Sequence, residues 1–251
     1  MPQAAAAKGI TWLYVILLPL CLGIHTSCQG QQQQQQVTGE YTYQKPSSGG
    51  TGKVYMGREI AAMISPAGGA WLARETREEE DHAQQAIESM ELRPNSVVAD
   101  IGAGVGFYTL QIAPKVPKGK VYAVEVQDAF VKTLQERKQE LGLTNMEVVK
   151  GGTKTTNLAA NSLDLAFMVD VYHELEYPRE VLQDIYRALK PDGILLLLEY
   201  RAEDPDLNVK ELHKMSAAQV KKELEANGFI LYRKEDFLPR QHFIMFRKAA
   251  K

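Results

Sequence analysis

Residues 98–108, with the sequence VADIGAGVGFY, constrain the fold of this chain more than any other stretch. An apolar run ends in Asp100 and is followed by three glycines at alternate positions, Gly102, Gly104 and Gly106. A strand that turns through glycines into a helix lets a ligand approach the backbone at the helix N-terminus. We therefore expect a ligand site at this turn.

The spacing of the glycines separates two kinds of nucleotide-type site. A dinucleotide fingerprint reads G-x-G-x-x-G, whereas here the third glycine comes one residue earlier and an acid stands two residues before the first. Glu125 ends the next predicted strand, 25 residues after Asp100. A carboxylate offers a pair of acceptor oxygens, which suits a cis-diol. The alternative is a tight turn that needs its glycines only for packing.

Strands and helices alternate after Pro94, which predicts a parallel sheet. Residues 163–169 are apolar except for Asp164, as expected of a central strand that is covered on both faces. We therefore predict an α/β fold with a Rossmann-like, doubly wound sheet of seven mostly parallel strands. The predicted strands cover residues 97–101, 121–126, 146–150, 163–169, 194–199, 229–233 and 242–247.

Residues 58–247 resemble bacterial class I methyltransferases that use S-adenosyl-L-methionine (SAM), especially an exported group. Besides the glycine turn, the stretches GREIA at 57–61, VDVYHE at 169–174 and LHKM at 212–215 carry the resemblance. It implies the class I methyltransferase fold and SAM as the cofactor, and it does not name the methyl acceptor. The cofactor-binding residues that it implies are Asp100, Gly102, Ala103, Gly104, Gly106, Tyr108, Glu125, Val126, Thr153 and Asp170.

The candidate catalytic residues Asp170, Tyr172 and His173 follow a predicted strand, whose carboxyl end should face the ligand. His173 could act as a base for an acceptor that carries a proton, or it could fix its loop by hydrogen bonds. Asp170 needs a cation or donors, which the ammonium of the methionine moiety or a nearby Lys or Arg could supply. No histidine pair has the spacing of metal ligands along the chain, so we predict no metal.

Residues 1–28 have the pattern of a signal peptide or membrane anchor. Lys8 precedes an apolar run at 10–24, which is shorter than the roughly 20 residues that span a bilayer, and small polar residues follow as far as Cys28. Ser27 and Cys28 resemble the end of a bacterial lipobox, which favours lipid anchoring at Cys28. We expect an exported domain in the cell envelope or periplasm that associates with the membrane through this segment.

Three further segments follow. Residues 29–53 are polar and rich in Gln, Gly and Ser, which predicts a disordered tether. Residues 54–92 are expected to form a pre-domain lid and a helix that begins with a capping box at Thr76 and Glu79. Residues 93–251 are the predicted SAM-binding methyltransferase domain.

Charge and cysteine content narrow the function. The net charge of -2 gives no reason to expect nucleic acid as a partner. No cysteine follows Cys28, so the predicted domain can hold no disulfide. The expected function is SAM-dependent methyl transfer to a small molecule or a cell-envelope component. The alternative is a non-catalytic exported lipoprotein that binds another ligand in a SAM-type pocket, because SAM is a cytosolic metabolite.

Overall fold

The structure is a computed structural model that describes residues 41–249. The predicted signal or anchor segment at 1–28, the lipid attachment at Cys28 and the first part of the predicted tether lie outside the described residues. Within residues 41–249, we find no helix of sufficient length and apolar character to cross a membrane.

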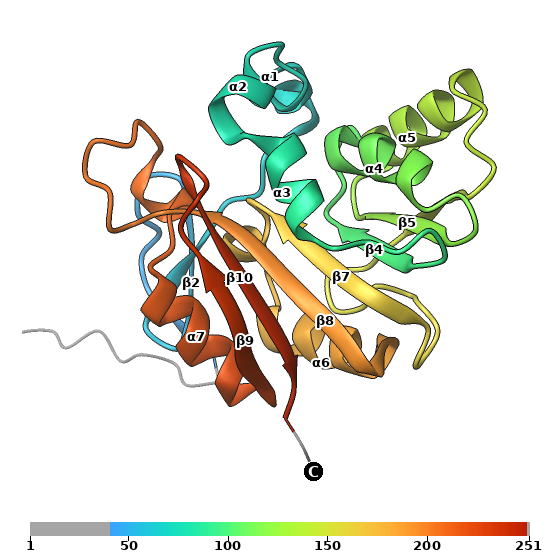
Figure 1. The fold of residues 1–251 in the computed structure, drawn as a ribbon. Helices are drawn as coiled ribbons and strands as arrows, with labels where there is room; N and C mark the ends of the chain where they lie inside the picture. Colours follow the sequence, from blue (N-terminus) through green and yellow to red (C-terminus); the bar gives the residue numbers. More distant parts are fainter. Residues whose placement is uncertain (1–40, 250–251) are drawn as a thin grey trace, which may run out of the picture. The chain divides into compact units, whose positions relative to one another are not determined.

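A seven-stranded sheet forms the centre of the fold, in the order β6-β5-β4-β7-β8-β10-β9 (Figure 1). The first five strands in that order pair in parallel, and β10 pairs antiparallel with both β8 and β9. The predicted Rossmann-like, doubly wound sheet of seven mostly parallel strands is therefore confirmed. The strands are β4 (Val97–Ile101), β5 (Lys120–Glu125), β6 (Met146–Lys150), β7 (Leu163–Val169), β8 (Leu189–Tyr200), β9 (Phe229–Glu235) and β10 (Gln241–Lys248).

Helices cover both faces of this sheet (Figure 1). On one face, α6 (Pro178–Ala188) and α7 (Ala217–Ala226) pack their apolar sides against the central strands. On the other, α3 (Ala83–Ser89) and α4 (Phe107–Ile112), which is followed by the short η2 (Ala113–Lys115), do the same. Helix α5 (Asp128–Glu140) packs Leu134 against Ala123 of β5. Burial on both faces explains why β7 and residues 194–198 of β8 are almost wholly apolar.

A small antiparallel sheet precedes the main one and consists of β1 (Tyr41–Tyr43), β2 (Gly50–Tyr55) and β3 (Arg58–Ala61). The prediction of a disordered tether at 29–53 is thus wrong for residues 41–53. The carboxylate of Glu59 accepts hydrogen bonds from the backbone amides of Ser47 and Gly52, at 3.1 and 2.8 Å, and so fixes the polar loop before β2. Composition alone misses this order because the partner lies in the following strand.

The expected lid lies between the small sheet and α3. It contains η1 (Pro66–Gly68), α1 (Gly69–Leu72) and α2 (Arg77–Asp81). The predicted capping box is wrong, because the hydroxyl of Thr76 donates to Glu80 at 2.5 Å and caps no backbone amide. His82, with a φ of 51°, separates α2 from α3, so the predicted continuous helix is two short ones.

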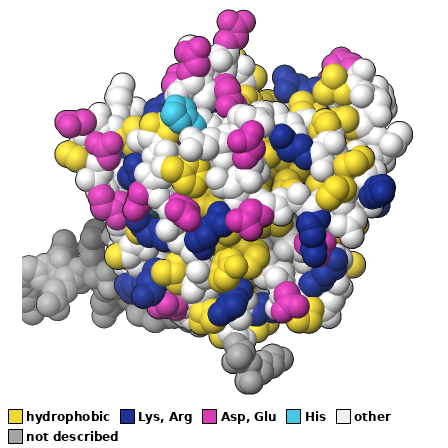
Figure 2. Space-filling view, in the orientation of Figure 1, with side chains coloured by type: hydrophobic (Ala, Val, Ile, Leu, Met, Phe, Trp, Pro, Cys, Tyr) yellow, Lys and Arg dark blue, Asp and Glu magenta, His cyan; other side chains and the backbone are white. Residues whose placement is uncertain are grey.

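Side chains of both charges mix on the face drawn in Figure 2, over β8, β9 and β10 as well as the lid. The hydroxyl of Ser216 accepts a hydrogen bond from the amide of Gln219 at 3.1 Å and so caps the N-terminus of α7. Helix α6 ends at Ala188, and β8 starts directly at Leu189, so residues 190–193 belong to the strand.

Candidate active site

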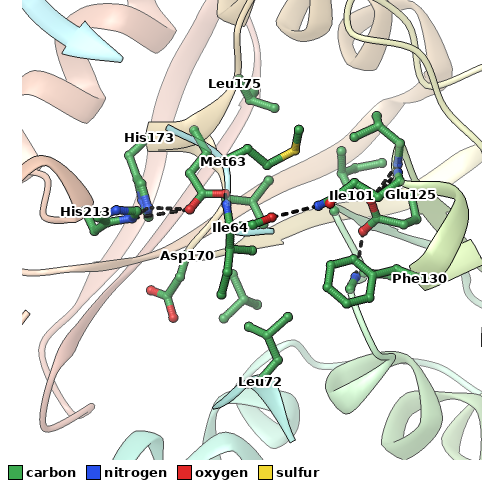
Figure 3. Close-up of a pocket in the computed structure, with 18 of the residues that line it drawn as sticks. Met63, Ile64, Leu72, Ile101, Glu125, Phe130, Asp170, His173, Leu175 and His213 are labelled. Atoms are coloured by element: carbon green, nitrogen blue, oxygen red, sulfur yellow. Dashed lines mark hydrogen bonds and ion pairs between the residues drawn. The ribbon is translucent and has the colours of Figure 1, made fainter. Parts of the chain in front are cut away.

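A cavity of about 740 Å³ lies at the carboxyl ends of β4, β5, β7 and β8. Its volume falls within the roughly 300–1,000 Å³ that small-molecule sites occupy. In Figure 3, Glu125 and Phe130 lie at one end of the cavity, and His173 and His213 lie at the other. The cavity stands at the edge of the sheet where ligands bind in open α/β folds.

The turn after β4 forms one wall. Gly102 has a φ of 76°, and a Cβ atom at this position would lie 2.6 Å from a methyl carbon of Val171. Gly104 has a φ of 54° and would bring a Cβ atom to 3.1 Å from Leu72 of the lid. Both glycines therefore allow the backbone to approach the cavity, and both line it together with Ala103.

Gly106 has a different position. It does not line the cavity, and a Cβ atom there would lie 2.8 Å from Leu134 of α5. Its φ of 85° and its place before the first residue of α4 make it a packing glycine of the turn. The prediction that Gly106 binds the cofactor is therefore not supported by its surroundings.

Glu125, the last residue of β5, is buried in the cavity wall. Its Oε1 accepts hydrogen bonds from the amides of Val126 and Gln127, at 2.7 and 2.8 Å, and its Oε2 accepts one from Gly104 at 2.9 Å. These donors hold the carboxylate in one orientation. Because each carboxylate oxygen can accept more than one hydrogen bond, acceptor capacity is left for hydroxyls of a ligand.

Two further acids, Asp100 and Asp170, line the cavity and are deeply placed. Burial raises the pKa of Asp100 to about 7, although a hydrogen bond of 2.6 Å from the hydroxyl of Thr109 opposes this. Burial, together with the negative charge of Glu199, raises the pKa of Asp170 to about 7 as well. Both acids would be stabilised in their charged form by a cation in the cavity.

Asp170 is the stronger candidate for contact with such a cation. The amide of Gln241 donates to its Oδ2 at 2.7 Å, whereas its Oδ1 is buried without a hydrogen-bond partner in the structure. Its φ of 54° is unusual for a residue with a side chain, and such strain concentrates at functional sites. The hydroxyls of Tyr108 and Tyr200, which also line the cavity, are likewise buried without partners.

His173 lies at the opposite end from Glu125. Its Nδ1 is 2.6 Å from Oε2 of Glu199, and its Nε2 is 3.0 Å from Nδ1 of His213. Burial opposes protonation of the ring, but the charge and the hydrogen bond of Glu199 raise the pKa of His173 above its usual value. Since an ionised Glu199 can only accept, His173 carries a proton on Nδ1.

Tyr172 does not reach the cavity. Its side chain is fully buried, and its hydroxyl donates to Glu223 of α7 at 2.8 Å. The structure therefore does not bring Tyr172, the first residue of η3 (Tyr172–Glu174), to the cavity, because its side chain is turned toward α7. The predicted residues that the cavity does bring together are Asp100, Gly102, Ala103, Gly104, Tyr108, Glu125, Val126, Thr153, Asp170 and His173.

Several lining residues were missed by the sequence reasoning. Ile64 and Leu72 come from the lid, and Phe130 comes from the first turn of α5 (Figure 3). The side chain of Gln127 donates to the carbonyl of Ile64 at 3.0 Å and so ties the lid to the end of β5. No local pattern marks these contacts, since each joins segments that are distant in sequence.

His213, in η4 (Glu211–His213), is the most consequential residue of this kind. It lies beside His173 although 40 residues separate the two. Together with Glu174 they form a group whose potential metal-ligating atoms lie within 4.8 Å of one another. The prediction of no metal considered spacing along the chain, and this group arises only from the fold.

The cavity fits SAM by its chemistry. A cationic ligand would satisfy the unpaired oxygen of Asp170, and a ribose would meet the fixed carboxylate of Glu125. The glycine turn leaves room for backbone contacts, and apolar side chains such as Phe130 supply surface for a base. The unpartnered hydroxyls of Tyr108 and Tyr200 offer donors for a carboxylate.

Comparison with known proteins supports this assignment. Residues 99–197 match the family model described as "Methyltransferase domain". A ubiquinone/menaquinone biosynthesis C-methyltransferase from Hydrogenovibrio crunogenus is 29% identical over 119 residues, which cover 47% of each protein. The chain thus spans about half the length of the curated relatives that it matches.

Solved structures agree in fold. A SAM-dependent methyltransferase from Aquifex aeolicus has a TM-score of 0.70 and 28% identity, over 74% of this chain and all of that one. The [4+2]-cyclase SpnF has a TM-score of 0.59 at 17% identity, over 68% of this chain and 80% of that one, which shows a shared fold only. Residues 99–197 thus resemble a methyltransferase domain, and the chain has the class I fold of SAM-dependent methyltransferases.

Proposed function

We propose that this protein transfers the methyl group of SAM to a small molecule or a cell-envelope component that enters the cavity at its His173 end. The observation that carries the proposal is the buried, unpaired Oδ1 of Asp170 in a cavity that also presents Glu125. A ligand with a cationic group at Asp170 and a diol at Glu125 matches an adenosyl sulfonium compound. SAM, when bound, supplies an electrophilic methyl group.

The residues of the chain would act mainly by positioning. Glu125 would hold the ribose hydroxyls, and Asp170 would pair with the ammonium of the methionine moiety. Because methyl transfer is an in-line displacement, fixing the two reactants near each other supplies much of the rate acceleration. The lid contributes Ile64 and Leu72, whose apolar surfaces exclude water from the cavity.

His173 is the residue that could take a proton from the methyl acceptor at this end of the cavity. With Nδ1 protonated toward Glu199, its Nε2 is the unprotonated nitrogen, which accepts a hydrogen bond from Nδ1 of His213 at 3.0 Å until a substrate takes that place. An acceptor that carries a proton on oxygen, nitrogen or sulfur would lose it to this nitrogen. His173 thus remains a candidate catalytic residue, whereas Tyr172 does not.

The first experiment is calorimetric titration of the full-length protein with SAM and S-adenosylhomocysteine. Micromolar affinity, about -8 kcal/mol, would support a working site. Transfer of a labelled methyl group from SAM to envelope fractions or small-molecule extracts would then test the reaction. Binding with no transfer to any fraction would favour the non-catalytic alternative, and no binding to either compound would refute the proposal.

The predicted location is a separate proposal. An exported domain should appear in the membrane or periplasmic fraction and should be cut by protease added to spheroplasts. Loss of membrane association in Cys28→Ser would support lipid anchoring, since thioether attachment needs the cysteine. Full protection of the domain in intact spheroplasts would contradict export without affecting the proposed reaction.

A further inference from the structure

The acceptor end of the cavity contains a compact group of three potential metal ligands, His173, Glu174 and His213. Nε2 of His173 is 3.0 Å from Nδ1 of His213 and 3.8 Å from Oε1 of Glu174, and Nδ1 of His213 is 3.3 Å from the same oxygen. Figure 3 shows His173 and His213 side by side at this end. In a tetrahedral zinc site with bonds of about 2.0–2.1 Å, ligand atoms lie about 3.3 Å apart.

The surroundings orient two of these ligands. Nδ1 of His173 is held by Glu199, and both side chains are 1% exposed. Oε1 of Glu199 accepts a second hydrogen bond from the amide of Tyr172 at 2.8 Å, so the carboxylate cannot rotate freely. A carboxylate behind a histidine is the usual outer-shell support of a metal-bound imidazole, because it fixes the tautomer and raises the basicity of the ligating nitrogen.

Glu174 is supported in a similar way. Its Oε2 accepts a hydrogen bond from the amide of Ile64 in the lid at 3.1 Å, which leaves Oε1 facing the two histidines. The side chain of Glu174 is only 10% exposed. The structure therefore places a fixed nitrogen and a fixed oxygen toward one point, with His213 completing the group.

Charge favours a cation at that point. The carboxylates of Glu174, Glu199 and Asp170 all interact electrostatically with His173. With neutral imidazoles, this end of the cavity carries an excess of negative charge in a partly desolvated place. A divalent ion would offset most of the negative charge of these three carboxylates.

We propose that Nε2 of His173, Nδ1 of His213 and Oε1 of Glu174 bind one divalent transition-metal ion, with zinc best matched to the ligands and their spacing. Two histidines and one glutamate recur in catalytic zinc sites, where a further position stays open for water or substrate. All three residues line the cavity, so the open position would face it.

Metal binding requires one proton movement. In the structure, Nε2 of His173 is the acceptor, so Nδ1 of His213 carries the hydrogen between the two rings. When Nδ1 of His213 binds the metal, the proton must move from Nδ1 to Nε2 of the same ring. The exchange is open to solvent, because the side chain of His213 is 23% exposed.

The consequence for catalysis rests on the proposed function. An ion at this end would bind a methyl acceptor through an oxygen or sulfur atom and would favour its deprotonated form, with the proton released to solvent; methyl transfer from SAM would then leave S-adenosylhomocysteine. The acceptor class would then be a hydroxyl- or thiol-bearing compound that coordinates the ion. With the ion bound, Nε2 of His173 would be a metal ligand and could not act as the base. The ion would then promote deprotonation of the methyl acceptor in place of His173.

The test is a titration of chelator-treated, full-length protein with Zn²⁺ by calorimetry and with Co²⁺ by absorption spectroscopy, without SAM. Cys21→Ser and Cys28→Ser form the background, because both thiols could bind zinc outside the described residues. We expect one ion per chain and a Co²⁺ spectrum typical of tetrahedral coordination. His213→Ala should weaken zinc binding at least tenfold, since even outer-shell changes cost about 10–100-fold.

His82→Asn is the matched control, because it removes an exposed histidine outside the group and Asn tolerates its φ of 51°. Zinc binding should be unchanged in this variant. No stoichiometric binding by the background protein, or equal binding by His213→Ala, would overturn the proposal. Because SAM is absent, zinc binding without SAM binding would refute only the proposed function, and the reverse would refute only the metal site.

Discussion

Oε2 of Glu125 accepts a hydrogen bond from the backbone amide of Gly104 at 2.9 Å, which joins the end of β5 to the glycine turn after β4. The two sequence features that first indicated a nucleotide-type site are therefore in direct contact. A carboxylate held in this way is already oriented before a ligand arrives, so little ordering is needed on binding.

Replacement of Glu125 by Gln should weaken the binding of SAM and of S-adenosylhomocysteine. Loss of charged hydrogen bonds to the ribose costs about 1–3 kcal/mol, or roughly 5- to 150-fold in affinity. Calorimetry measures this directly. Glu147→Gln, on the exposed side of β6, should bind both compounds normally. Unchanged affinity in Glu125→Gln, with an unchanged melting temperature, would contradict the assigned role.

SAM binding should strengthen with pH up to neutrality. Asp170, with a pKa raised to about 7 by burial, must lose its proton to pair with the ammonium of SAM. Between about pH 5.5 and 7.5 the affinity should rise by up to about 20-fold, while the ammonium itself stays mostly charged. In Asp170→Asn, which suits the φ of 54°, affinity should be lower at pH 7.5 and should depend less on pH, with Asp100 accounting for the remaining dependence.

The stability of the ligand-free protein should change in the opposite direction. The folded pKa values of Asp100 and Asp170, about 7, exceed the usual value of 3.8, so the folded state binds more protons between these limits. Stability therefore falls as pH rises toward about 7. Urea unfolding at several pH values measures this slope, and Asp170→Asn should reduce it. An identical slope in the variant would show that Asp170 is not the titrating group.

Local signals predicted the central fold well. The strand β4 depends on residues within a few positions of one another, and its bounds are found as expected. Helix α2 also begins after Thr76 as predicted, but the capping hydrogen bonds of that prediction are absent. Thr76 bonds to Glu80, which also accepts from Arg74 and Arg240, so a tertiary cluster overrides the local capping pattern.

Contacts between distant segments set the limits of the sequence analysis. The order of residues 41–53 depends on Glu59, and the acceptor end of the cavity depends on His213 meeting His173 across 40 residues. Tyr172 shows the converse case. It stands within a motif that faces the ligand, yet its own side chain turns to Glu223, because neighbours along the loop after β7 point in different directions.

Gly102→Ala should reduce both stability and SAM binding. A left-handed φ costs a residue with a side chain roughly 1–2 kcal/mol, and the new methyl would also lie 2.6 Å from Val171, which lines the cavity. Gly57→Ala, with a φ of 96° and no atom near its Cβ position, is the control for backbone strain alone. The double variant Gly102→Ala, Val171→Ala should recover part of the lost stability, and strict additivity in this cycle would contradict the clash.

Arg58→Ala should be strongly destabilising because it breaks a buried ion pair that links the small sheet to α7. The guanidinium donates two hydrogen bonds to Glu223, at 2.9 and 3.0 Å, and the carboxylate is fully buried. Removal of one partner of such a pair costs about 3–5 kcal/mol. Urea unfolding measures this loss, with Lys132→Ala as the control, since the pair of Lys132 with Glu136 is exposed and should contribute less than about 1 kcal/mol. A similar small loss in both variants would mean that the small sheet contributes little to the stability of the domain, and that the order of residues 41–61 depends on contacts other than this ion pair.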